Sequence, residues 1–136
     1  MKAPAVIDTN VVVAGLLTHQ TEAPTALILD GMLAAAFPYV VSTALLAEYR
    51  DVLTRVKLRK LHGLSVAEVE ILVVELAQHA IVLQPVAAMP APDPGDQHLW
   101  ELLAARDDLI LVTGDKRLLQ SDLGIRISTP QQFLAG

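Results

Sequence analysis

The sequence predicts an α/β fold in which helices cover both faces of a mostly parallel sheet. Short apolar segments suited to strands alternate along the chain with segments of helical periodicity. The strand segments are apolar at almost every position, which is typical of strands buried on both faces. Polar turns at Asp8 and Asp115 follow two of these segments, and ligand sites in such sheets lie beyond the carboxyl ends of strands. We therefore expect the functional site near these two turns.

The chain begins with a strand, two helices and a second strand. An apolar strand is predicted at residues 5–7, and the polar turn after it leads into a helical pattern that runs through Leu17. Residues 21–36 are rich in Ala and Leu and predict a second helix. Pro38 ends this helix because its ring cannot continue the hydrogen-bond pattern, and a strand follows at residues 39–41.

The middle of the chain is predicted to hold two helices and a third strand. One helix covers residues 43–62, and its apolar face carries Leu45, Tyr49, Val52, Leu53 and Val56. Ser65 and Glu68 have the spacing of a capping box and open a helix that ends near His79. A short apolar strand at residues 81–83 follows this helix.

A proline-rich loop separates these elements from the last part of the chain. Residues 84–95 are constrained because they contain Pro85, Pro90, Pro92, Pro94 and Gly95. The elements beyond this loop are a helix over residues 96–106, a strand at 109–112, a short helix around 118–119, a strand near 125–127 and a terminal helix from residue 130. Thr129 suits the cap of the terminal helix, with Pro130 at its first position.

Length and composition favour one domain in the cytosol. The 136 residues are 53% hydrophobic, which is enough for a well-filled core in a single domain spanning residues 1–136. The chain has no cysteine, so an oxidising compartment gains no support and a cytoplasmic protein is expected. No uninterrupted apolar stretch approaches the roughly 20 residues of a membrane-spanning helix, so we expect no membrane association.

The net charge of −5 argues against a protein that coats nucleic acid through its overall charge. Any contact with RNA must therefore be local. Half of the ten basic residues fall in one short segment, as Arg50, Arg55, Lys57, Arg59 and Lys60. This segment could form an edge that contacts phosphates. It could equally be a solvated helix end whose positive charge complements the helix dipole.

Four acidic residues are candidates for a catalytic site, and each also has a purely structural interpretation. Asp8 and Asp115 could cap the helices that follow them. Glu48 could be a surface residue at the border of an apolar helix face. Asp93 suits a helix cap ahead of a proline, whereas Asp96 shares a helix face with apolar residues and so points toward the interior.

A cluster of these acids would require a cation. Two carboxylates about 4 Å apart repel by roughly 4 kcal/mol at an effective dielectric constant of about 20. Ligand sets of oxygen alone, without His or Cys, select hard ions such as Mg²⁺ or Mn²⁺. Two such ions about 3.5 to 4 Å apart could activate a water molecule and stabilise the leaving oxygen of a phosphodiester. The acids therefore suggest a nuclease.

The ordered set of motifs resembles the PIN-domain family. The motifs are V-I-D-T-N-V at residues 6–11, the acid Glu48, D-P-G-D at residues 93–96 and V-T-G-D at residues 112–115. None of them is specific alone, but together they appear in the family's order over nearly the whole chain. The resemblance implies a three-layer α/β/α sandwich with metal-dependent ribonuclease activity. For a compact chain of this size, it also implies the toxin of a toxin–antitoxin pair.

The resemblance also assigns roles to individual residues. It implies that the metal-binding, catalytic acids are Asp8, Glu48, Asp96 and Asp115, supported by Asn10, Thr113 and the auxiliary acid Asp93. In the assignment we favour, Glu48 places a second ion or orients the attacking water, and the other three acids of the catalytic set hold the first ion. The expected partners are single-stranded or looped RNA, a cognate antitoxin protein and a second copy of the chain.

Two other classes of function stay open at this point. A Mg²⁺-dependent phosphatase of the haloacid-dehalogenase type also places Asp after its first strand, but it would want a second Asp where Asn10 stands. A non-catalytic module that binds RNA or protein on the same fold is the other alternative. The four histidines, His19, His62, His79 and His98, lack metal-ligand spacing and are interpreted as surface or helix residues.

Overall fold

The computed structural model describes residues 3–120 and 126–136 of the chain. The strands in these residues are β1 (Ala5–Ile7), β2 (Val40–Val41), β3 (Ile81–Val82), β4 (Ile110–Val112) and β5 (Ile127–Ser128). The helices are α1 (Thr9–Leu17), α2 (Pro24–Leu33), α3 (Thr43–Leu53), α4 (Val56–His62), α5 (Val66–His79), the 3₁₀ helix η1 (Pro94–Asp96), α6 (Gln97–Leu103), α7 (Lys116–Leu119) and α8 (Pro130–Ala135).

All described strand pairs are parallel, as the sequence predicts. The strands β1, β4 and β5 form one sheet in the order β1-β4-β5, and β2 pairs with β3 in a second. A parallel bridge between Ala5 and Tyr39 links the two sheets. The strands therefore run side by side in the order β3-β2-β1-β4-β5, which places the ends of β1 and β4 next to each other.

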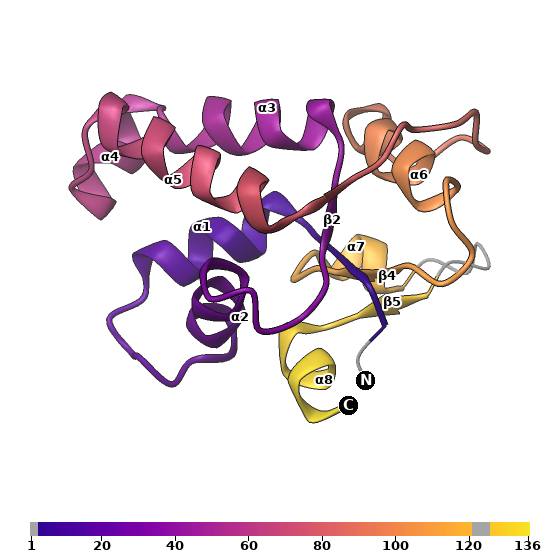
Figure 1. Ribbon diagram of the computed structural model, residues 1–136, viewed down its shortest axis with the longest axis horizontal. Helices are drawn as coiled ribbons and strands as arrows, with labels where there is room; N and C mark the ends of the chain where they lie inside the picture. The colour runs from indigo at the N-terminus through magenta and orange to yellow at the C-terminus, as the bar shows by residue number, and fades with distance from the viewer. Residues whose placement is uncertain (1–2, 121–125) are drawn as a thin grey trace.

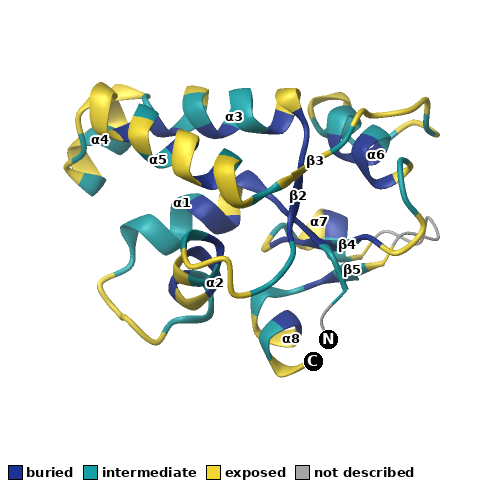
Figure 2. Cartoon of the chain, viewed as in Figure 1, coloured by how far each residue is buried: buried dark blue, intermediate teal, exposed yellow. Residues whose placement is uncertain are grey.

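Helices lie on both sides of the strands, so the three-layer α/β/α arrangement is confirmed. Figure 1 shows α3, α5 and α6 above the strands and α2 and α8 below them. The buried residues of the strands and of the inner helix faces form one core, and they are dark blue in Figure 2. No helix in the described residues is long and apolar enough to cross a membrane.

The single helix predicted over residues 43–62 is wrong, because the chain breaks it into α3 and α4. The Thr54 hydroxyl donates to the backbone carbonyl of Arg50 at 2.7 Å, and Arg55 adopts an extended conformation with ψ of 136°. A threonine that bonds to the preceding turn competes with helix continuation. As a result Val56 is 59% exposed instead of sharing the buried face of Leu45, Tyr49 and Leu53.

Other predicted boundaries move by a few residues. The helix predicted over residues 21–36 is α2, which begins with proline in its first turn and ends at Leu33. The helix predicted over 96–106 is the 3₁₀ turn η1 followed by α6. The third strand lies at an edge and is exposed on both residues, contrary to the expected burial. The predicted strand near 125–127 is β5, and residue 125 lies outside the described residues.

Candidate functional site

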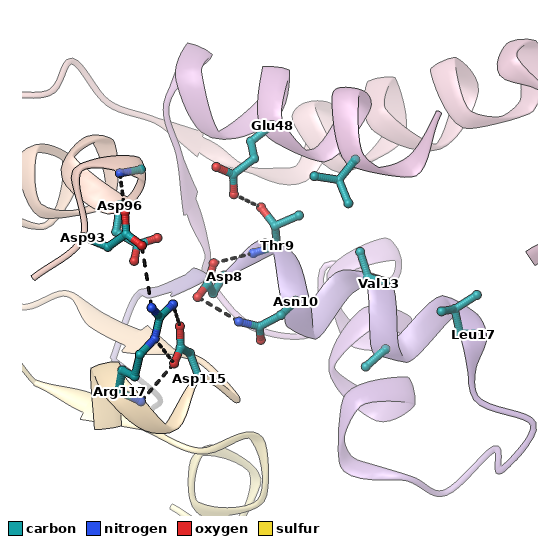
Figure 3. Close-up of a pocket in the computed structure, with 13 residues that line it drawn as sticks. Asp8, Thr9, Asn10, Val13, Leu17, Glu48, Asp93, Asp96, Asp115 and Arg117 are labelled. Carbon is teal, nitrogen blue, oxygen red and sulfur yellow. Dashed lines mark hydrogen bonds and ion pairs between the residues drawn. The ribbon is translucent and has the colours of Figure 1, made fainter. Parts of the chain in front are cut away.

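The acids singled out in the sequence line one pocket of about 590 Å³. Asp8 and Asp115 reach it from the ends of β1 and β4, and Glu48 reaches it from α3. Asp93 and Asp96 enter from η1 and the residue before it. Figure 3 shows these side chains surrounding a shared space, with apolar residues of α1 extending the pocket to one side. The predicted convergence of acids from four elements is therefore present.

Asp8 is both a helix cap and a member of the site. One carboxylate oxygen, Oδ1, accepts from the backbone N–H of Thr9 at 2.8 Å and so caps α1. The other, Oδ2, accepts from the Thr113 hydroxyl at 2.8 Å and from Asn10 Nδ2 at 3.0 Å. Burial raises the pKa of Asp8, the hydrogen bonds from Thr113 and Thr9 oppose the rise, and the charges of nearby acids add to it. The capping interpretation is correct but does not exclude the functional one.

Asn10 and Thr113 tie together the turns after β1 and β4. Asn10 Nδ2 donates to the Thr113 hydroxyl oxygen at 3.2 Å, and Asn10 Oδ1 accepts from the backbone N–H of Gly114 at 3.0 Å. The fully buried Thr113 hydroxyl oxygen also accepts from the backbone N–H of Asp115 at 3.0 Å. Both residues thus bond to Asp8 and to the backbone at Gly114 or Asp115, and they hold Asp8 and Asp115 in a fixed relation.

Glu48 is held by hydrogen bonds to both of its carboxylate oxygens. The Thr9 hydroxyl donates to Oε1, and His98 Nε2 lies 2.9 Å from Oε2. The hydrogen bond from His98 is the main cause that lowers the pKa of Glu48, and the same contact raises the pKa of His98. The neighbouring Tyr49 on α3 donates its buried hydroxyl to the carbonyl of Ile7, which fixes α3 against the end of β1.

The interpretation of His98 as a surface or helix residue is correct in that His98 lies on helix α6, but it missed a contact with the site. Its side chain is only 19% exposed, and it forms an ion pair with Glu48 when protonated. Sequence spacing could not indicate this contact, because the two residues lie 50 positions apart on different helices. The only local signal was the position of His98 two residues after Asp96.

Asp96 faces the pocket without a capping bond of its own. It makes no side-chain hydrogen bond at the start of α6, whereas Asp93 caps η1 by accepting from the backbone N–H of Gly95 at 2.9 Å. Burial raises the pKa of Asp96 to about 6, and the negative charges of Asp8 and Asp93 add to the rise. Asp96 is therefore the acid whose negative charge the pocket accommodates least well without a cation.

Arg117 provides a counter-charge that the sequence did not suggest. Its Nη2 lies 3.2 Å from Oδ2 of Asp115, and its Nη1 lies 3.7 Å from Oδ2 of Asp93. Asp115 also caps α7 through the backbone N–H of Arg117 at 2.9 Å. These contacts lower the pKa of Asp115, and the contact to Asp93 joins Asp115 to the proline-rich loop.

The donor set of this pocket suits a hard divalent ion. Its oxygen ligands are carboxylates, and burial together with like charge raises the pKa of Asp8 and Asp96, which a cation would offset. In residues 3–120 and 126–136, however, no three acidic or histidine side chains stand close enough to hold one ion as they are placed. Binding by three of them requires side-chain movement, and Asp115 is held as it stands by an ion pair with the exposed Arg117.

The five basic residues predicted as an RNA edge do not line this pocket. Arg50 forms an ion pair with Glu70 at 2.6 Å, and Arg59 and Lys60 occupy the last turn of α4. This placement agrees with the helix-dipole interpretation. Arg55, the residue before α4, does not line the pocket either, although its charge is a minor cause that lowers the pKa of Glu48.

Comparison with known proteins identifies a family. A family model described as "PIN domain" matches residues 4–117. Among solved structures, the chain is similar to the RRP44 PIN domain of T. brucei, with 15% sequence identity and a TM-score of 0.49. That alignment covers 100% of this chain and 81% of the other. A search of curated proteins finds no match.

Proposed function

Because this chain belongs to the PIN-domain family, we propose that it is a Mg²⁺- or Mn²⁺-dependent endoribonuclease. PIN domains are generally metal-dependent nucleases that act on RNA. The observation that carries the proposal is the convergence of Asp8, Glu48, Asp96 and Asp115 from separate elements on one pocket. Isolated helix caps have no reason to meet in this way, whereas a phosphodiesterase site requires it.

The residues divide into ion-binding and supporting groups. Asp8, Asp96 and Asp115 would hold the first ion, and Glu48 would place a second ion or orient the attacking water. A bound divalent ion would supply an activated water and offset the charge on the phosphate. Thr113 keeps Asp8 in place by donating to one of its oxygens, which leaves the Asp8 carboxylate oriented before any ion binds.

An apolar extension of the pocket supports RNA as the substrate. Val13, Leu17 and Val52 line the pocket beyond the acids, along the groove between α1 and α3. An unpaired nucleotide could place its base against these side chains while its phosphate meets the acids. In this arrangement Arg55, just before α4, and Lys57, in its first turn, would contact the RNA backbone farther along the RNA chain. We therefore infer single-stranded or looped RNA as the substrate.

The main alternative is a non-catalytic module that binds RNA or protein on the same fold. The absence of three ligating side chains within reach of one point, among the described residues, is the observation that favours it. If the acids only capped helices and balanced Arg117 and His98, they would need no ion. The two functions differ in whether a divalent metal binds and whether RNA is cut.

Cleavage of a mixed single-stranded RNA by the purified protein tests the proposal. We expect cutting with Mg²⁺ or Mn²⁺ that is lost in EDTA and in Asp8→Asn, which keeps a helix-capping side chain but removes a charge. Asp108→Asn is the matched control, because Asp108 is an exposed acid paired with Arg106 outside the pocket. Equal cutting by Asp8→Asn, or no cutting with either metal over several RNAs, would favour the binding module.

We propose further that the protein is a cytoplasmic toxin with a cognate antitoxin, and that it is a homodimer. Both statements rest on the family resemblance. Induced expression in a bacterial host should stop growth with the natural sequence and not with Asp8→Asn. Light scattering of the purified protein should give twice the mass of 14.6 kDa. Normal growth or a mass of one chain would refute the respective statement.

A further inference from the structure

Among the described residues, the side chain of His98 forms a hydrogen bond with one group, the carboxylate of Glu48. Nε2 lies 2.9 Å from Glu48 Oε2, so a hydrogen on Nε2 is donated to that oxygen. The other ring nitrogen, Nδ1, is buried and has no hydrogen-bond partner within the described residues. The orientation of the ring is therefore set by Glu48 and by packing, because no other polar group among the described residues bonds to it.

The helix that carries His98 is anchored in the core. Leu99 and Trp100, the next two residues, are buried at 0% and 1% exposure. α6 is therefore a fixed platform, and Asp96, which lines the pocket, is the residue just before it. The contact from His98 to Glu48 joins this platform to α3 on the opposite wall of the pocket. It thus connects Glu48 to the helix whose N-terminal residue is preceded by Asp96.

Glu48 depends on such a link because its side chain has several rotatable bonds. Thr9 holds only Oε1, and rotation about that single contact would leave Oε2 free to turn. The second donor on Oε2 removes this freedom. With both oxygens engaged, the remaining lone pairs of the carboxylate point in fixed directions, which is what a group that orients a water or a second ion needs.

We propose that His98 is a positioning residue of the nuclease site, which holds the Glu48 carboxylate against Thr9 and sets the direction in which Glu48 acts. This inference rests on the proposed function. It gives His98 no contact with substrate, so its effect must pass through Glu48. Removal of a partner that orients a metal-site ligand typically lowers activity or metal affinity by about 10- to 100-fold.

A double-mutant cycle between His98→Ala and Glu48→Ala tests whether the effect passes through Glu48. We expect His98→Ala to lower kcat for RNA cleavage by about tenfold or more with little change in KM. In the Glu48→Ala background the same change should have no further effect. His98→Gln should restore part of the activity, because its amide nitrogen can donate to the carboxylate in place of Nε2. His79→Ala, an exposed histidine on α5, is the matched control.

Titration calorimetry with Mn²⁺ alone gives a second readout that does not depend on RNA cleavage. We expect weaker Mn²⁺ binding in His98→Ala than in the natural sequence. Glu48→Ala and the double variant with both substitutions should bind Mn²⁺ equally. If the protein binds Mn²⁺ with this coupling but cuts no RNA, the proposed function fails and the role of His98 stands. Three results would overturn the role of His98. They are an equal loss of activity from His98→Ala with and without Glu48, no rescue of activity by His98→Gln, and no Mn²⁺ binding at all.

Discussion

Replacement of Asp96 by Asn should stabilise the protein when metal is absent. The pKa of Asp96 is raised from 3.8 to about 6 by burial and by neighbouring acids, so the folded state disfavours its charged form. A rise of this size corresponds to about 3 kcal/mol at neutral pH. Solvent screens a carboxylate that is partly exposed, and we therefore expect a gain of about 1 kcal/mol for Asp96→Asn.

The pH dependence of this gain has a definite sign. A raised pKa means that the folded state binds more protons than the unfolded chain between about pH 4 and pH 6. The contribution of Asp96 to stability is therefore fully present below its unfolded pKa and is lost as the pH rises through about 6. Asparagine cannot ionise. The free energy of unfolding of Asp96→Asn should therefore equal that of the natural sequence near about pH 4 and exceed it above about pH 6.

Urea denaturation in EDTA at about pH 4.5 and pH 7.5 measures the gain in stability and its dependence on pH. Asp108→Asn is the control, because Asp108 is an exposed acid paired with Arg106 outside the pocket. Addition of Mg²⁺ should then stabilise the natural sequence and not Asp96→Asn, since ion binding adds to the stability of the folded state. Lower stability of Asp96→Asn at pH 7.5, or a difference independent of pH, would refute this reasoning.

Three other substitutions test separate contacts. Thr113→Val removes the hydroxyl that donates to Asp8, so the rate of RNA cleavage should fall about tenfold or more. Thr113→Ser keeps the hydroxyl and should keep most of the rate. Equal rates for the two variants would show that this hydrogen bond does not support cleavage. Tyr49→Phe removes the hydroxyl that donates to a buried carbonyl at the end of β1. Urea denaturation should show that the free energy of unfolding falls by about 1–3 kcal/mol, and an unchanged value would mean that the bond is unimportant. Arg117→Gln frees Asp115 from an exposed ion pair, so calorimetry should show Mn²⁺ affinity about two- to fivefold tighter; weaker binding would mean that Arg117 supports the site.

Local signals in the sequence predicted those parts of the fold that neighbours within a few residues decide. The capping box at Ser65 and Glu68 is present, and so is the capped, proline-started helix after Thr129. The break at Thr54 was missed, because apolar spacing continued across it and gave no hint that the threonine would bond to the preceding turn. The exposure of β3 was missed as well, since an apolar edge strand has the same composition as a buried one.

For the candidate site, the sequence alone determined which acids stand at strand ends and helix starts, and their order along the chain. Only the tertiary structure decided what each acid contacts. The bond from Thr113 to Asp8 spans 105 positions and that from His98 to Glu48 spans 50, so both depend on the path of the whole chain. Arg117 could be located two residues after Asp115 from the sequence, but its reach to Asp93 depends on how the proline-rich loop folds back. Hydrophobic periodicity and capping are short-range, whereas charge partners are set by the packing of distant segments.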